Sequence, residues 1–198
     1  MSFEVLHALA LRRKADLDAL ARSTGFDTAA IEAALAPAVA DGRAIAARGL
    51  FVLSPAGAAW LEAQYPNAFA AQRADTQLAT DYARFEFINR ELKALITQWQ
   101  TLTVGGKQIP NDHSDADYDA RLIDTLANLH ERAETLLNQM AKRLARLDRY
   151  ATRLGDALDR AENGESDWVC GVRCDSYHTV WFEMHEDLLR LLGRQRQE

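Results

Sequence analysis

The sequence predicts a mainly α-helical protein with one small β-hairpin near its N-terminus and an antiparallel helical bundle in the remainder. Three observations lead to this fold class. Apolar residues recur at helical spacing through most of the 198 residues. Two short strand-like runs, 44–47 and 50–53, flank the dipeptide Arg48-Gly49. Only ten glycines and four prolines are present, which leaves little room for long linkers.

The first 65 residues have the element order of a compact domain. Three helices are predicted over residues 3–13, 16–23 and about 28–42, with Asp27 or Thr28 as the cap of the third. The hairpin follows, and Ser54-Pro55-Ala56-Gly57 closes it and starts another helix. This order resembles the winged helix-turn-helix domains of bacterial transcription regulators, with the hairpin as the wing. We therefore predict a winged-helix domain over residues 1–65.

The third helix of this domain is unsuited to reading DNA. DNA-reading helices contact bases and phosphates mainly through Arg, Lys, Asn and Gln. Residues 27–42 contain none of these and carry Asp27, Glu32 and Asp41 instead, while Pro37 is expected to kink or shorten the helix. The net charge of −6 also disfavours nucleic acid and anionic membranes. DNA is thus the less favoured partner, and a protein contact is the expected use of this surface.

Residues 68–198 are predicted to form a second domain, a helical bundle. Its helices are expected over residues 68–101, 115–144, 147–162 and 175–192. The main break is the segment 103–114, which contains Gly105, Gly106 and Pro110. A loop with Trp168, Cys170 and Cys174 precedes the last helix.

The last helix is amphipathic, and its apolar face contains two histidines. On a helical wheel the inward face comprises His178, Trp181, Phe182, His185, Leu188, Leu189 and Leu192. The opposite face comprises Glu183, Glu186, Asp187 and Arg190. A buried imidazole needs hydrogen-bond partners, at a cost of about 1–3 kcal/mol if it has none. Either the histidines are satisfied core residues, or they line a polar pocket inside the bundle.

Several common kinds of site are absent from the sequence. It has no phosphate-binding loop, dinucleotide fingerprint, serine nucleophile elbow or HExxH zinc motif. The two cysteines lack further ligands at zinc spacing, and His178 and His185 are too far apart on one helix to chelate together, so no metal site is predicted. The N-terminus lacks a basic segment before its apolar stretch, and no apolar run reaches the roughly 20 residues of a membrane span. We expect a reduced, cytoplasmic protein.

One polar cluster is the candidate site. Asn111-Asp112-His113 precedes a predicted helix, and Asp175 and His178 begin the last helix, so the two are expected to meet at one end of the bundle. His113 or His178 is then the candidate base, oriented by Asp112 or Asp175. The predicted substrate-binding residues are Asn111, Asp175, Trp181, His185, Trp99, Trp168 and Tyr118. The three tryptophans and the tyrosine would form the walls of a pocket that suits a small aromatic ligand. The alternative is that Asp112 and Ser114 only cap the helix, with His113 in solvent.

Three segments carry a second resemblance: NDHSDADYD, YATRLGDALDRAENG and DSYHTVWFEMHEDLLRLLG. They look like the helical region that accompanies a winged-helix module in bacterial proteins related to phosphoenolpyruvate-utilising enzymes. These enzymes are dikinase-like phosphotransferases similar to pyruvate phosphate dikinase and phenylphosphate synthase. The resemblance implies a partner subunit with ATP-grasp and phosphohistidine domains. This chain has neither domain, so ATP and Mg²⁺ would be bound by that partner and not by this chain.

The leading hypothesis is a cytoplasmic accessory subunit that binds a small, phenolic acceptor for such a phosphotransferase in the catabolism of aromatic compounds. Any catalytic role would then be that of a subunit of a kinase or aryl-phosphate synthase. The alternative is a winged-helix transcriptional regulator whose helical domain senses a ligand or dimerises. A purely structural interaction module with core histidines is the third possibility.

Overall fold

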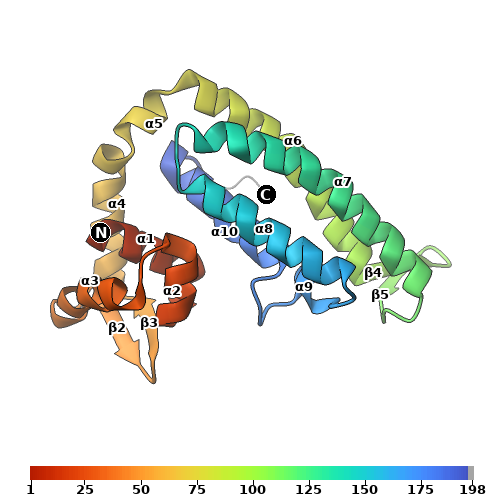
Figure 1. Ribbon diagram of the computed structural model, residues 1–198, viewed down its shortest axis with the longest axis horizontal. Helices are drawn as coiled ribbons and strands as arrows, with labels where there is room; N and C mark the ends of the chain where they lie inside the picture. Colours follow the sequence, from red (N-terminus) through yellow and green to blue (C-terminus); the bar gives the residue numbers. More distant parts are fainter. Residues whose placement is uncertain (196–198) are drawn as a thin grey trace. The chain divides into compact units, whose positions relative to one another are not determined.

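The computed structural model describes residues 1–195, which form ten helices and two small antiparallel sheets (Figure 1). The mainly α-helical prediction is therefore confirmed. The chain divides into two compact units: residues 1–74 with the end of the chain from His185, and Asp75–Met184. Helix α10 (Tyr177–Leu192) contributes residues to both units. The domain division predicted at residues 65–68 stays a prediction. No helix in the described range has the length and apolar character needed to cross a membrane.

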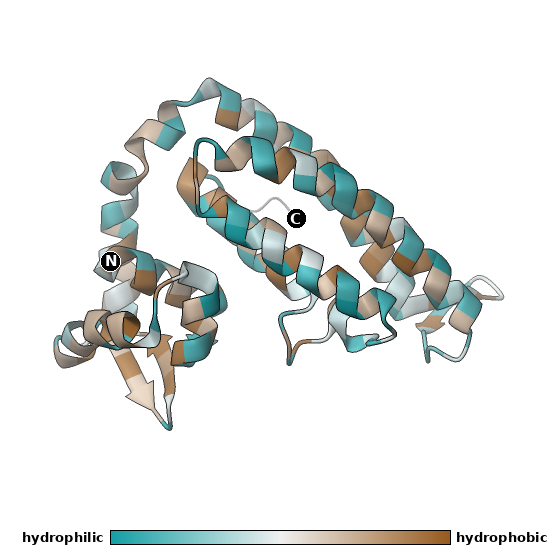
Figure 2. Cartoon of the chain, viewed as in Figure 1, coloured by the Kyte–Doolittle hydropathy of each residue, from teal (hydrophilic) through white to brown (hydrophobic). Residues whose placement is uncertain are grey.

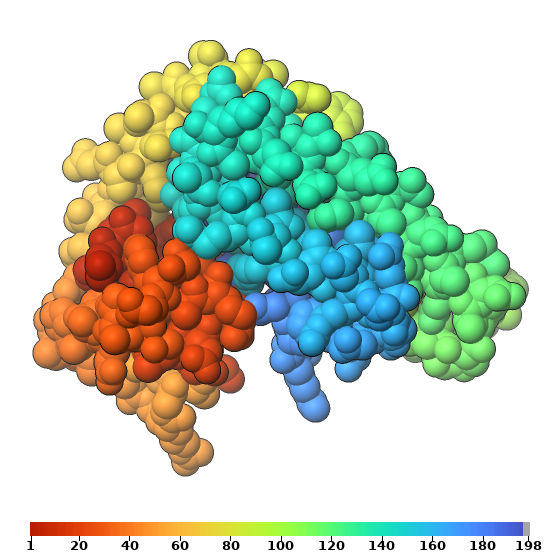
Figure 3. All heavy atoms as spheres, in the orientation of Figure 1, coloured from red at the N-terminus to blue at the C-terminus, as the bar shows by residue number. Residues whose placement is uncertain are grey.

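The first unit combines helices with a three-stranded sheet. Its elements are α1 (Ser2–Arg12), β1 (Lys14–Ala15), α2 (Leu17–Thr24), α3 (Thr28–Ala40), β2 (Ala44–Ala47), β3 (Leu50–Leu53), α4 (Pro55–Ala68) and α5 (Ala70–Ala74). Strand β3 is central, with β1 and β2 antiparallel on either side of it. The hairpin strands β2 and β3 have the predicted bounds, and their tip projects from the rest of this unit (orange in Figure 3).

Short polar side chains begin the helices of this unit. The carboxylates of Asp16 and Asp27 accept hydrogen bonds from backbone N–H groups in the first turns of α2 and α3, and the Ser54 hydroxyl does the same for α4. Helix α3 continues through Pro37 to Ala40. Gly57 is required where α4 meets the hairpin, because a Cβ there would lie 2.0 Å from the carbonyl oxygen of Arg43.

The long helix predicted from Ala68 is interrupted in the structure. Helix α4 ends at Ala68, the short α5 follows, and α6 (Thr76–Gln100) begins afresh. The break has a local cause, because the Asp75 carboxylate accepts hydrogen bonds from the backbone N–H groups of Gln77 and Leu78. This capping residue starts a helix in the middle of a segment whose apolar spacing alone appeared continuous.

The second unit is built from long helices packed side by side. It contains α6, β4 (Thr101–Val104), β5 (Lys107–Pro110), α7 (Ala116–Ala141), α8 (Leu147–Glu162), α9 (Asp167–Cys170) and the first half of α10. Helix α7 packs against both α6 and α8. Apolar and polar residues alternate along these helices (Figure 2), and the apolar ones form the core. Its fully buried members include Phe85, Leu92, Leu126, Leu137 and Tyr177.

The predicted break at residues 103–114 contains a second hairpin. Strands β4 and β5 pair antiparallel, with Thr101 opposite Pro110 and Val104 opposite Lys107. Gly105 and Gly106 form the turn, with φ of 58° and 79°. Two consecutive residues with positive φ are what a tight hairpin turn needs, and glycine adopts them without strain. The break at these glycines was predicted, whereas the strands beside them were not.

The predicted polar face of α10 is partly wrong. Glu183 and Asp187 are only 4% and 1% exposed, whereas Phe182, expected inside, is 36% exposed. Each buried carboxylate has a cationic or hydrogen-bonding partner within its own unit. Glu183 accepts two hydrogen bonds from Arg153 on α8, at 2.9 and 2.8 Å, and Asp187 lies 2.8 Å from His7 on α1. A charged residue is buried where such a partner exists, and helical periodicity cannot reveal the partner.

Removing the cation of the buried pair should destabilise the protein strongly. Arg153→Met leaves the Glu183 carboxylate buried without its bidentate partner, for an expected loss of about 3–5 kcal/mol in the free energy of unfolding. Arg132→Met is the matched control, since it removes the exposed pair between Arg132 and Glu91, expected to be worth at most about 1 kcal/mol. Urea denaturation of both variants checks the difference. Equal, small losses would contradict it.

Candidate functional site

The β4–β5 hairpin returns the chain to the end of α6, where it places a buried asparagine. The backbone N–H of Asn111 donates to the carbonyl oxygen of Gln100 at 2.9 Å. The Asn111 amide Nδ2 donates to the carbonyl oxygen of Trp99 at 3.0 Å and to the Asp119 carboxylate at 3.1 Å. Both of its hydrogens are therefore used, and Asn111 joins the end of α6 to the first turns of α7.

His113 is held against this joint in an unusual backbone conformation. Its φ is 59°, in the left-handed region, and its backbone N–H donates to Asn111 Oδ1 at 3.1 Å. The imidazole lies beside the Trp99 ring, with 4.7 Å between centroids and a 41° tilt. Its side chain is 36% exposed. Left-handed conformations outside glycine are uncommon and, where the surroundings impose them, they occur often at functional sites.

The partner of His113 is Asp119, from the first turns of α7. Its carboxylate Oδ2 lies 2.8 Å from His113 Nδ1. Nδ1 is also 3.3 Å from Asn111 Nδ2, but both amide hydrogens of Asn111 point at better acceptors. The neutral imidazole is therefore protonated on Nδ1, donating to Asp119. Its other nitrogen, Nε2, has no hydrogen-bond partner among residues 1–195 and keeps its lone pair for a ligand.

Asp112, one of the two carboxylates predicted to orient the base, bonds to Ser114 and not to His113. Its carboxylate accepts hydrogen bonds from the backbone N–H and the hydroxyl of Ser114, and these bonds hold its pKa below the usual range. Asp115 caps α7 by accepting from the Tyr118 N–H. Asp119 was not among the predicted site residues. The sequence did contain a signal for this role, because a residue one turn inside α7 can face the loop that precedes the helix, where His113 lies.

His178 lies near the same end of α6 with a different neighbour. Its Nδ1 is 3.6 Å from the Cys170 sulfur, which in turn accepts a hydrogen bond from the Gln100 side chain at 3.0 Å. Burial lowers the pKa of His178 and raises the pKa of the Cys170 thiol. Both groups are therefore neutral near pH 7. Cys170 is not an activated thiolate, and His178 is a less exposed base than His113.

Two consecutive residues of α6 link the helix to the two histidines. Trp99 packs on His113, and Gln100 donates to Cys170, whose sulfur lies beside His178. The structure thus brings the two predicted candidate bases to one end of the second unit. No hydrogen bond joins the two rings within the described chain.

The other predicted site residues are dispersed. Asp175 lies 3.5 Å from Arg153. Trp181 is buried, donates from Nε1 to Asn89 at 3.0 Å and stacks on Phe85. His185 is 4% exposed and belongs to the first unit. Arg160 covers the Trp168 ring at 4.1 Å. Tyr118 remains close, because its hydroxyl donates to the carbonyl oxygen of Gln98.

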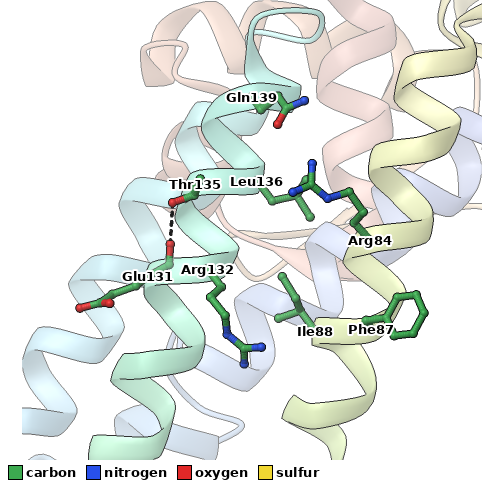
Figure 4. Close-up of a pocket in the computed structure, with 8 residues that line it drawn as sticks. All are labelled: Arg84, Phe87, Ile88, Glu131, Arg132, Thr135, Leu136 and Gln139. Atoms are coloured by element: carbon green, nitrogen blue, oxygen red, sulfur yellow. Dashed lines mark hydrogen bonds between the residues drawn. The ribbon is translucent and has the colours of Figure 1, made fainter.

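A groove between α6 and α7 is a separate feature of the second unit (Figure 4). Its volume is about 520 Å³, and Ile88 and Leu136 form its apolar floor. The remaining walls are Arg84, Phe87, Glu131, Arg132, Thr135 and Gln139. The groove contains neither a histidine nor any residue of the His113 cluster, so it offers a surface for contact but not the imidazole chemistry described above.

The arrangement around His113 can accept a proton. The Asp119 carboxylate, hydrogen-bonded to Nδ1, fixes the orientation of the ring and stabilises the imidazolium that forms when Nε2 accepts a proton. Trp99 supplies an aromatic face beside it.

Residues 1–195 contain no group of three or more His, Cys, Asp or Glu side chains arranged to hold a metal ion. No protein family, curated protein or solved structure matches this chain.

The tautomer of His113 can be measured directly. At a pH where the ring is neutral, we expect the proton on Nδ1, and ¹⁵N NMR of histidine-labelled protein distinguishes this from the commoner Nε2–H form. In Asp119→Asn the carboxylate acceptor is lost, and the Nε2–H tautomer should become the major one. A wild-type ring already protonated on Nε2 would show that Asp119 does not orient it.

Acid should destabilise the protein through its buried histidines. Burial lowers the pKa of both His130 and His178 below the ordinary value of 6.5. Between the folded and the unfolded pKa the unfolded chain binds more protons, so the free energy of unfolding falls as the pH drops below about 6.5. We expect the Tm to decrease between pH 7.5 and pH 5.5, less steeply in His178→Gln. A Tm independent of pH over this window would contradict the expectation.

Proposed function

We propose that this chain is the acceptor-binding accessory subunit of a dikinase-like phosphotransferase, and that its second unit binds a small phenolic compound at His113. The observation that carries the proposal is the pairing of His113 Nδ1 with Asp119 at 2.8 Å, with the Trp99 ring alongside. A phenol has both features that this arrangement recognises: a ring to pack on tryptophan and a hydroxyl to bind an imidazole nitrogen.

The role of the chain would be to position and deprotonate the acceptor. Phosphoryl transfer depends mainly on positioning and on stabilising charge. The acceptor oxygen would form a bond to the phosphorus carried by the partner's phosphohistidine as the phosphorus–nitrogen bond breaks, and the hydroxyl proton would pass to His113 Nε2. Asp119 stabilises the resulting imidazolium. ATP and Mg²⁺ belong to the partner subunit, which the resemblance of the three sequence segments implies.

The first unit supports a role in protein contact. Its order α1-β1-α2-α3-β2-β3 contains the three helices and the hairpin on which the winged-helix proposal depends, and its strands are arranged β1-β3-β2. The exposed residues of α3 are Glu32, Ala33, Ala36, Pro37, Val39 and Ala40 among others, and the helix carries no Lys, Arg, Asn or Gln. This alanine-rich surface, with an acidic and no basic side chain, suits a protein partner better than it suits DNA.

The same topology favours one alternative, a transcriptional regulator whose helical unit senses a ligand or dimerises. In that case Arg22, Arg43 and Arg48 around α3 and the hairpin would contact phosphates. An electrophoretic mobility shift on DNA from its own operon, specific in sequence and weakened by salt, would favour the regulator. Its absence at low salt would leave the protein-contact proposal in place.

A thermal-shift screen tests the acceptor site. Phenol and hydroxylated aromatic compounds should raise the Tm, since a ligand at a hundred times its Kd adds about 2.7 kcal/mol to stability. The shift should disappear in His113→Ala and shrink in Asp119→Asn. Asp124→Asn is the matched control: it makes the same charge change on the exposed face of α7, and the shift should persist. If no aromatic hydroxy compound produces a shift, the chain is better regarded as a structural interaction module.

A further inference from the structure

Asn111 is hydrogen-bonded to each of the three residues that form the proposed acceptor site. Its Nδ2 donates to the carbonyl oxygen of Trp99 at 3.0 Å and to Asp119 Oδ1 at 3.1 Å, and its Oδ1 accepts from the backbone N–H of His113 at 3.1 Å. Asn111 is buried, so water competes little for these bonds. A side-chain amide has two hydrogens to donate, and both are used here, so Asn111 has no donor left for a ligand.

The neighbours of Asn111 determine which way its amide points. Trp99 and Asp119 present acceptors to it, and the backbone N–H of His113 presents a donor. In the reverse orientation the amide oxygen would face the two acceptors, and the amide nitrogen would face the N–H group. All three hydrogen bonds would be lost at a buried position, where unpaired polar groups are costly. The Asn111 amide therefore has one stable orientation.

The bond to Asp119 fixes how that carboxylate faces the imidazole. Asn111 holds Oδ1 of Asp119, while Oδ2 lies 2.8 Å from His113 Nδ1. A carboxylate without the first bond would be free to rotate about its side-chain bonds and to turn towards solvent. Because one oxygen is held, the other is presented to Nδ1. The imidazole therefore keeps its proton on Nδ1 and its lone pair on Nε2.

The other two bonds of the Asn111 side chain fix the backbone of the site. Its Oδ1 accepts from the N–H two residues further along the chain, which is a pattern by which asparagine closes turns, and it does so at His113, where φ is 59°. Its Nδ2 binds the carbonyl oxygen of Trp99, whose ring lies 4.7 Å from the imidazole, centroid to centroid. The left-handed turn and the tryptophan are thus held by one amide.

We infer that Asn111 is the positioning residue of this site: it orients the Asp119 carboxylate and the turn at His113, and through them it sets the direction of the Nε2 lone pair. Its chemical consequence rests on the proposed function, because the base that Asn111 positions is the base that would take the proton of the phenol. Precise placement of such a base contributes to the rate of proton transfer. Asn111 was predicted to bind the substrate, and the inference assigns it a role behind the base instead.

¹⁵N NMR of histidine-labelled protein without any ligand tests the inference. Asn111→Ala removes all three side-chain bonds, and Asn111→Leu removes them while keeping a side chain of similar size and branching. In both variants the Asp119 carboxylate loses its bond to the amide, and Nδ1–H should no longer be the major tautomer of the neutral His113 ring. Calorimetric titration with phenol should show binding weakened by about tenfold, the loss of one charged hydrogen bond.

Asn89→Ala is the matched control for general damage. Asn89 is also buried and hydrogen-bonded in the second unit, but it lies about 15 Å from Trp99 along the axis of α6. Its removal should lower the Tm and leave the His113 tautomer unchanged. The inference is overturned if Nδ1–H stays the major tautomer in both Asn111 variants, or if Asn89→Ala changes the tautomer equally.

The two measurements separate this inference from the proposed function. If the tautomer changes as expected but phenol does not bind even to the wild type, Asn111 still positions His113, and the acceptor role of the site is what fails. If phenol binds to the wild type and the tautomer is the same in both Asn111 variants, the acceptor site stands and the positioning role of Asn111 is refuted.

Discussion

The buried carboxylates of α10 are the constraint on which the rest of the structure depends. Glu183 and Asp187 are one helical turn apart, and each is buried beside a partner on another helix: Arg153 on α8 for Glu183, and His7 on α1 for Asp187. An ion buried alone costs several kcal/mol, so any packing of α10 that separated it from these partners would be heavily penalised. Apolar contacts permit many registers of one helix against another, whereas the Glu183–Arg153 and Asp187–His7 contacts permit only a few registers of α10.

The sequence was sufficient for features determined by near neighbours. The strands of the first hairpin and helix α8 have the predicted bounds, because turn residues and amphipathic spacing act over a few positions. The sequence did not predict features that depend on a single side chain or on a residue distant in the sequence, such as where a helix begins or whether a carboxylate is buried. Asp75 divides what looks like one helix, and Glu183 looks exposed until Arg153, thirty residues away in sequence, is brought beside it. Periodicity carries no information about such partners.

The candidate site shows the same division. Residue type made His113 and Asn111 candidates, and the structure places His113 beside Trp99 and links His178 to Gln100 through Cys170, at the same end of α6. The orienting carboxylate was predicted to be Asp112 or Asp175, whereas Asp119 is the carboxylate that lies beside His113. The left-handed turn at His113 folds the chain back onto α7, and such a turn at a residue other than glycine is not predictable from composition.

That turn also limits how this position can change. Its backbone conformation is tolerated well by glycine, asparagine and aspartate, and among the residues found there with some frequency histidine alone exchanges a proton near neutral pH. A replacement that suits the backbone therefore abolishes proton exchange, and one that retains a titratable group of another shape strains the turn. Position 113 therefore carries a backbone constraint and a side-chain constraint at once, and few residue types satisfy both.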